Sequence, residues 1–167
     1  MAEEPEQLVY VVDTSSWLSI EGHPAQNRIL SRLFELASAG KIKIPPEVLD
    51  ELERISDIAA WVNQHKELLI ERNTGDVEYL LLGGRIAHEF PAMAGARGRR
   101  NKADPWVIAT AIIANNPHIR TVVCNETLAN RPNRKIPTAC QKYGIGCFPL
   151  FNMLSREFPD DGWEEEQ

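Results

Sequence analysis

The sequence lacks the features that mark membrane, secreted or zinc-binding proteins. No apolar run is long enough to span a bilayer, and residues 1–6 are acidic, unlike a secretory signal. The chain has only 3 cysteines (Cys124, Cys140 and Cys147) and 4 scattered histidines, with no Cys-x-x-Cys pair. We therefore expect reduced thiols, no zinc site, and a cytoplasmic protein that makes no membrane contact.

The chain also lacks an excess of positive charge, because its formal net charge is −6. Taken as a uniform property, this value argues against a nucleic-acid partner. The charge is segregated, however: the segment 91–135 is strongly basic, whereas 159–167 is almost entirely acidic or uncharged. A basic middle with acidic ends favours a polyanion-binding face, and a mosaic of solvated surface charges is the alternative interpretation.

The order of apolar segments predicts an α/β fold in one domain. Residues 8–12 are apolar without polar alternation, which is typical of a strand buried on both faces in a parallel sheet. Further strands are expected at 41–44, 121–124 and 145–150, and helices at 29–37, 46–55, 58–70, 77–90, 104–113 and 136–143. This order predicts a sandwich with a mostly parallel sheet. We expect the domain to span 8–156, with acidic, flexible termini at 1–7 and 157–167 and a mobile loop at 91–102.

Four carboxylates stand at positions where they could converge. Asp13 ends the first strand, Glu51 lies in the helix that begins at Pro46, Asp104 is expected to cap the most hydrophobic helix, and Glu126 follows the third strand. Taken singly, each could be a cap, a turn residue or a solvated charge. Because strand ends and the starts of the following helices share one edge of a parallel sheet, we expect these four side chains to share one cleft.

Electrostatics indicates what such a cleft would hold. Two carboxylates about 4 Å apart repel by about 4 kcal/mol at an effective dielectric of about 20. The cluster is therefore unfavourable unless a cation occupies it or some of the acids are protonated. Oxygen ligands favour Mg²⁺ or Mn²⁺ over zinc, and such ions activate water for phosphodiester hydrolysis. The basic segment would then contact phosphate groups through Arg97, Arg99, Arg100 and Lys102.

Four stretches of the chain resemble the motifs of PIN-domain ribonucleases, and most closely those of VapC-type toxins of toxin–antitoxin pairs. These stretches are 11–15 (VVDTS), 48–52 (VLDEL), 102–111 (KADPWVIATA) and 122–126 (VVCNE), so the resemblance spans about 9–150. It implies a PIN-like three-layer sandwich and a Mg²⁺- or Mn²⁺-dependent endoribonuclease that acts as a toxin. The implied partners are RNA, a cognate antitoxin and, through the helices of 58–90, a second copy of the chain.

The resemblance also assigns roles to individual residues. Asp13, Glu51 and Asp104 match the metal-binding, catalytic acids, and Ser15 matches a small hydroxyl residue that follows the first acid. The fourth motif usually reads Thr-x-Asp, whereas this chain has Cys-Asn-Glu at 124–126. Glu126 would therefore reach the metal on a longer arm, without the hydrogen bond of the threonine hydroxyl.

Other functions fit the sequence less well or share the same fold. A receiver domain would need an acidic pair at the end of the first strand, and a haloacid-dehalogenase-type phosphatase would need Asp-x-Asp where Ser15 stands. A nucleotide-binding domain would need a glycine loop, which Thr14, Ser15 and Ser16 do not provide. The remaining alternative is a non-catalytic PIN-like module that binds RNA or protein.

Overall fold

A computed structural model describes residues 8–71, 76–91, 103–113, 119–125 and 136–166, and the fold in this part of the chain is built on a parallel sheet. Its strands are β1 (Leu8–Val12), β2 (Ile42–Lys43), β3 (Ile119–Val123) and β4 (Gly146–Phe148). They are ordered β2-β1-β3-β4, and every neighbouring pair is parallel. The predicted α/β class and parallel sheet are therefore confirmed.

Strand β1 lies in the middle of the sheet and explains the apolar start of the domain. Its register sets Tyr10 opposite Ile42 on one side and Val11 opposite Val122 on the other. Residues 9–12 are all buried. A strand with neighbours on both edges and helices on both faces exposes no side chain to water, so apolar residues in an unbroken run are favoured there.

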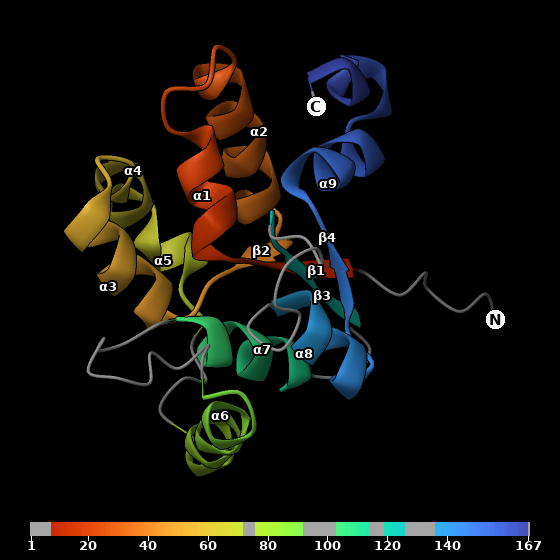
Figure 1. The fold of residues 1–167 in the computed structure, drawn as a ribbon. Helices are drawn as coiled ribbons and strands as arrows, with labels where there is room; N and C mark the ends of the chain where they lie inside the picture. Colours follow the sequence, from red (N-terminus) through yellow and green to blue (C-terminus); the bar gives the residue numbers. More distant parts are fainter. Residues whose placement is uncertain (1–7, 72–75, 92–102, 114–118, 126–135, 167) are drawn as a thin grey trace, which may run out of the picture.

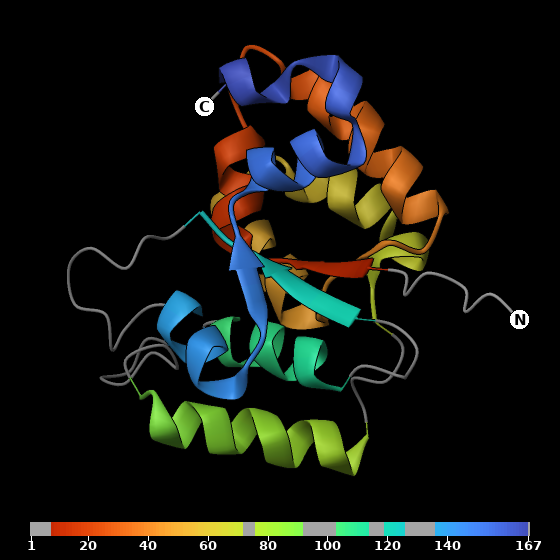
Figure 2. The ribbon, with the colours of Figure 1, turned by 90° about the vertical axis from the view of Figure 1, so that its right-hand side faces the viewer.

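Helices cover both faces of this sheet (Figures 1 and 2). Helices α1, α2 and α9 lie on one face, and α7 and α8 lie on the other, with α6 packed on the outer side of α7. The helices are α1 (Thr14–Ile20), α2 (Gln26–Ser38), α3 (Pro46–Ile55), α4 (Ala59–Gln64), α5 (Lys66–Leu69), α6 (Val77–Glu89), α7 (Asp104–Ile112), α8 (Ile136–Tyr143) and α9 (Leu150–Glu157). Two 3₁₀ helices follow, η2 (Pro159–Asp161) and η3 (Trp163–Glu166). In the described ranges, no helix has the length and apolarity needed to cross a membrane.

Several boundaries differ from the sequence-based expectation. Helix α1 was not predicted, and it begins immediately after β1 because Asp13 caps its N-terminus. The stretch 58–70 forms two short helices rather than one, and Ile70 pairs with Ile44 in an isolated bridge. Strand β4 stops at Phe148, because proline at 149 has no N–H for the sheet, and α9 begins one residue later.

The acidic C-terminal segment was expected to be flexible, but the structure packs it against the domain. Trp163 is completely buried, and its Nε1–H donates a hydrogen bond to Asp161 at 3.0 Å. Arg28 covers the Trp163 ring with its guanidinium 4.1 Å from the ring centroid. Arg32 donates two hydrogen bonds to the Asp161 carboxylate, at 2.7 and 2.8 Å. One buried tryptophan and one bidentate ion pair therefore hold this acidic segment. Residues 1–7 lie outside the described part.

Candidate functional site

Asp13 lies where β1 ends and α1 begins, at the carboxyl end of a central strand. It is only 1% exposed, and its extended backbone (φ −73°, ψ 158°) is that of a helix N-cap. One carboxylate oxygen accepts hydrogen bonds from the Ser15 backbone N–H at 3.2 Å and from the Ser15 hydroxyl at 2.8 Å. The carboxylate is thereby held in one orientation at the edge of the sheet where parallel α/β proteins bind ligands.

The Ser15 hydroxyl links the ends of β1 and β3. Besides its bond to Asp13, its oxygen accepts a hydrogen bond from the Asn125 backbone N–H at 3.1 Å and lies 3.7 Å from the Cys124 sulfur. Ser15 was predicted to bind substrate, and this stays a prediction. In the structure its hydroxyl makes hydrogen bonds within the protein and fixes the orientation of Asp13.

Asn125 has a structural role that the sequence analysis missed. Its side-chain oxygen accepts a hydrogen bond from the Leu150 backbone N–H at 3.0 Å, at the first residue of α9. It therefore connects the end of β3 to the start of α9. An asparagine directly after a buried strand was the available signal, because its short polar side chain readily bonds nearby backbone groups.

The three cysteines are free, as expected, and Cys124 and Cys140 are buried. A hydrogen bond with Cys124 lowers the pKa of the Cys147 thiol, but a hydrogen bond with Cys140, burial and the nearby charge of Asp13 outweigh it. The net effect raises the Cys147 pKa to about 12. Because the thiolate is the nucleophilic form of cysteine, this raised pKa disfavours nucleophilic chemistry by Cys147 at neutral pH.

The Glu51 side chain reaches the start of α7, where Asp104 lies. The Glu51 carboxylate oxygen Oε2 accepts a hydrogen bond from the Ala103 backbone N–H at 2.9 Å. Asp104 is 8% exposed and is the first residue of the helix, followed by Pro105. The expectation that Asp104 is the N-cap is therefore wrong: Ala103 takes that position and has no capping side chain. Glu51, from a neighbouring helix, accepts the N–H of this N-cap residue itself, as the acid of a capping box does, and the positive end of the helix dipole there favours its negative charge.

Glu47 is a further acid on the same side of α3 as Glu51, four residues earlier. The Tyr79 hydroxyl donates a hydrogen bond to it at 3.2 Å. Burial raises the pKa of the Glu47 carboxyl above its ordinary value and outweighs the lowering effect of its hydrogen bonds. Glu47 was not among the site residues predicted from the sequence. Only the four-residue spacing from Glu51 hinted at a shared environment.

The structure brings these elements to one end of the sheet (Figure 1). The junction of β1 with α1, helix α3 and the first turn of α7 lie at the same end, and α1 packs on α3 while α7 packs on β1. Among the residues that the structure describes, however, no group of three or more His, Cys, Asp or Glu side chains is arranged to hold a metal ion. The other predicted site residues, Glu126, Arg97, Arg99, Arg100 and Lys102, lie outside the described residues.

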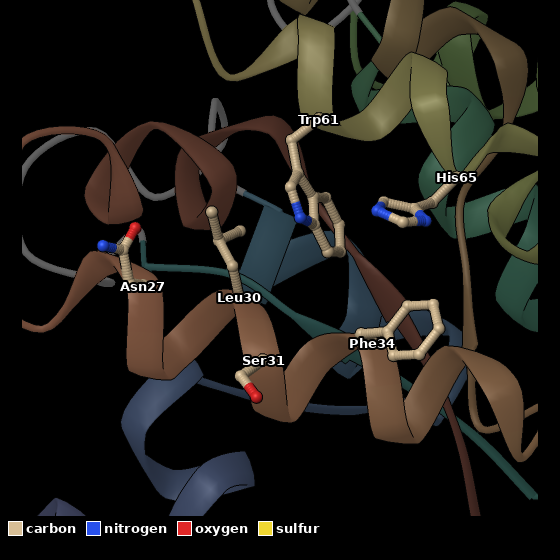
Figure 3. A pocket seen from close by; sticks show the side chains of 6 residues that line it. All are labelled: Asn27, Leu30, Ser31, Phe34, Trp61 and His65. Atoms are coloured by element: carbon tan, nitrogen blue, oxygen red, sulfur yellow. The ribbon is translucent and has the colours of Figure 1, made fainter.

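A separate hollow lies between α2 and α4, away from the residues predicted to act in catalysis (Figure 3). Its volume is about 380 Å³, and none of the predicted site residues lines it. Phe34 and Trp61 face it from opposite helices, and each ring contacts His65, with centroids 5.2 and 4.5 Å apart respectively. Its lining residues are Asn27, Leu30, Ser31, Phe34, Trp61 and His65. It is an aromatic surface hollow without a carboxylate.

Fold and site together define an α/β protein with a parallel sheet and buried carboxylates at the ends of its elements. Residues 10–158 match the family described as a domain of unknown function, DUF4411, and the chain belongs to this family. The match covers Asp13, Glu51 and Asp104. No curated protein and no solved structure matches the chain. The resemblance to PIN-domain ribonucleases therefore stays a prediction.

Proposed function

We propose that the protein is a Mg²⁺- or Mn²⁺-dependent endoribonuclease that hydrolyses RNA phosphodiester bonds, as the toxin of a toxin–antitoxin pair. The observation that carries this proposal is the burial of two carboxylates, Asp13 and Asp104, where β1 ends and α7 begins. A carboxylate removed from water is retained only where hydrogen bonds or a cation compensate its charge. The carboxyl end of a parallel sheet is also where such folds bind ligands.

The donor chemistry of this site fits magnesium or manganese. Mg²⁺ in phosphoryl-transfer sites uses one or two protein carboxylates and completes its coordination with water and substrate phosphate. Asp13 and Asp104 are the acids that would hold the ion, and Glu126 would add a further oxygen. The bound ion would supply a Lewis acid and an activated water. A site with so few protein ligands does not require a closed cluster of three side chains.

The other described residues support these two acids. Ser15 fixes the orientation of Asp13 through two hydrogen bonds. Glu51 holds the start of α7 through Ala103, and so fixes the place of Asp104. We therefore propose that Glu51 acts first as a positioning residue. Contacts to the RNA backbone are assigned to the basic segment 97–102 on its charge alone.

A non-catalytic module that binds RNA or protein is the second candidate. Two observations favour it: the Glu51 carboxylate already accepts a hydrogen bond from a backbone N–H, and the described residues include no cluster of three potential metal ligands. The two candidates differ in their response to metal. A binding module retains its RNA affinity in EDTA and does not cleave in Mn²⁺, whereas the nuclease cleaves only with the metal.

The test is cleavage of a random-sequence RNA pool in Mg²⁺, Mn²⁺ or EDTA, with 5′ ends mapped by sequencing. Asp13→Asn and Asp104→Asn are nearly isosteric and remove one charge each, so we expect cleavage to fall at least about 100-fold with the fold retained. Asp50→Asn, on an exposed position of α3, is the matched control and should cleave like the parent. Equal cleavage by the parent and Asp13→Asn would refute the assignment.

A further inference from the structure

Three aromatic rings line the hollow between α2 and α4 (Figure 3). The Trp61 ring lies on one side of the open space, and the rings of Phe34 and His65 lie on the other. Phe34 is 44% exposed, although it is a large apolar residue. Exposed apolar side chains that border a hollow are typical of ligand sites, and a volume of about 380 Å³ is enough for a small molecule.

The walls of this aromatic hollow are fixed by contacts within the protein. The Trp61 ring packs on Trp17, with centroids 5.9 Å apart, and Trp17 is completely buried. The His65 ring contacts both other rings, with its centroid 4.5 Å from that of Trp61 and 5.2 Å from that of Phe34. A ligand would therefore meet walls that are already ordered, and its binding would cost little conformational entropy.

The charge around the aromatic hollow favours a cation. A second hollow, of about 300 Å³, adjoins it and shares Leu30 and Trp61 with it. Glu21 and Asp57 line the second hollow, and no lysine or arginine is among the described residues that line either one. The Glu21 carboxylate accepts hydrogen bonds from the Ser56 hydroxyl at 2.6 Å and from the Asp57 backbone N–H at 3.1 Å. The resulting negative potential attracts a cation and repels phosphate groups such as those of RNA.

We propose that the aromatic hollow binds a small ligand with a quaternary ammonium group, such as choline. The faces of aromatic rings carry negative charge density and attract a cation that lies within about 6 Å of their centroids. A primary ammonium has three N–H donors, which would need acceptors that the rings of Phe34 and Trp61 do not offer. A quaternary ammonium has no N–H, so it can leave water for these rings without losing hydrogen bonds.

The other residues of the hollow suit the rest of such a ligand. Asn27 and Ser31 are exposed on α2 and line the same hollow, so their side chains can form hydrogen bonds with a ligand hydroxyl. The proposal does not depend on the chemistry at Asp13 and Asp104, because neither residue lines either hollow.

Isothermal titration calorimetry of the full chain tests this assignment with four probes. Choline and tetramethylammonium should bind saturably. Dimethylbutanol, the uncharged analogue of choline in which carbon replaces nitrogen, should bind at least about tenfold more weakly, because it lacks the charge that the rings attract. Spermidine, which carries only primary and secondary ammonium groups, should also bind more weakly than choline.

Substitutions at Phe34 separate the aromatic ring from apolar contact. Phe34→Tyr keeps the ring and should bind choline like the parent, whereas Phe34→Leu keeps an apolar side chain and should bind at least about fivefold more weakly. Asp57→Asn should weaken binding about twofold by removing one exposed charge. Leu81→Ala, which removes an exposed apolar side chain far along the sequence on α6, is the control and should match the parent. Far-ultraviolet circular dichroism verifies that each variant is folded.

Three results would overturn the proposal. The first is no saturable binding of either quaternary ammonium probe to the parent. The second is equal or tighter binding of dimethylbutanol or spermidine than of choline, which would show that the hollow does not select a quaternary cation. The third is choline binding by Phe34→Leu that equals that of the parent.

Discussion

The Glu51 carboxylate lies 2.9 Å from the backbone nitrogen of Ala103 and accepts its hydrogen bond. This one contact joins α3 to the start of α7, because it satisfies the backbone N–H of the N-cap residue of α7. It also distinguishes the role of Glu51 from the roles of Asp13 and Asp104. Asp13 and Asp104 are the buried carboxylates at the ends of their elements, and Glu51 holds one of those elements in place.

Substitution of Glu51 separates its positioning role from a charge requirement. Glu51→Gln keeps an oxygen acceptor for the Ala103 N–H, whereas Glu51→Ala leaves that partly buried donor without its partner. We expect Glu51→Ala to lower the free energy of unfolding by about 1–3 kcal/mol, and Glu51→Gln to lower it by much less. Urea denaturation of both variants measures the difference. Equal losses in the two variants would show that the hydrogen bond does not set the stability.

The adjacent glycines of α6 should respond oppositely to alanine. A Cβ at Gly83 would overlap the Trp106 ring, so Gly83→Ala must displace the contact between α6 and α7. We expect a loss of about 1–3 kcal/mol, as for other overpacked sites. Gly84 faces open space, so Gly84→Ala should raise stability by about 0.5–1 kcal/mol through helix propensity.

Thermal or urea unfolding of Gly83→Ala, Gly84→Ala and the parent at equal protein concentration measures these two changes in stability. Similar shifts in the two variants would contradict the packing of Gly83 against Trp106.

The Glu157 carboxylate should make part of the stability pH-dependent. Burial alone would raise its pKa, but hydrogen bonds from Tyr10 at 2.6 Å and Lys41 at 2.9 Å outweigh burial and lower it. A carboxyl whose pKa is lower in the folded state stabilises the fold at pH values above its unfolded pKa of about 4.3. That contribution is lost as the pH falls through the lower, folded value.

Glu157→Gln removes this titration. The stability gap between parent and variant should therefore be full near pH 7 and should shrink below about pH 4. Denaturation curves at several pH values measure the gap, and the exposed Glu53→Gln is the control. A gap that stays constant down to pH 3 would show that the Glu157 pKa is not lowered.

The sequence predicted the sheet better than the short helices around it. The unbroken apolar run of β1 reflects burial on both faces of the strand, and the helical spacing of apolar residues in 46–55 reflects burial on one face of the helix. An apolar pattern in the sequence records both directly. Helix α1 was not predicted because Thr14, Ser15 and Ser16 resemble a turn, and the hydrogen bond by which Asp13 caps the helix is what favours a helix there. The packing of the C-terminal segment was not predicted because its negative charge suggested that it is solvated. One buried residue, Trp163, holds it against the core.

The sequence predicted where the candidate site lies in the fold, but not which residues contact one another there. Asp13 could be placed from the point where the apolar run ends, because ligand sites lie at strand ends in parallel sheets. The bond from Ala103 to Glu51 joins residues 52 positions apart, and no local pattern encodes such a distant partner. The half-buried state of Glu47 likewise depends on Tyr79, which arrives from another helix.

The most direct test of the central claim is Mn²⁺ binding without RNA, measured by electron paramagnetic resonance of the free ion. The parent should bind Mn²⁺, and Asp13→Asn should bind it at least about tenfold more weakly, as expected when a charged ligand is lost. The Asp50→Asn control should match the parent. No saturable binding to the parent, or equal binding by the parent and Asp13→Asn, would contradict a metal site at the carboxyl end of β1.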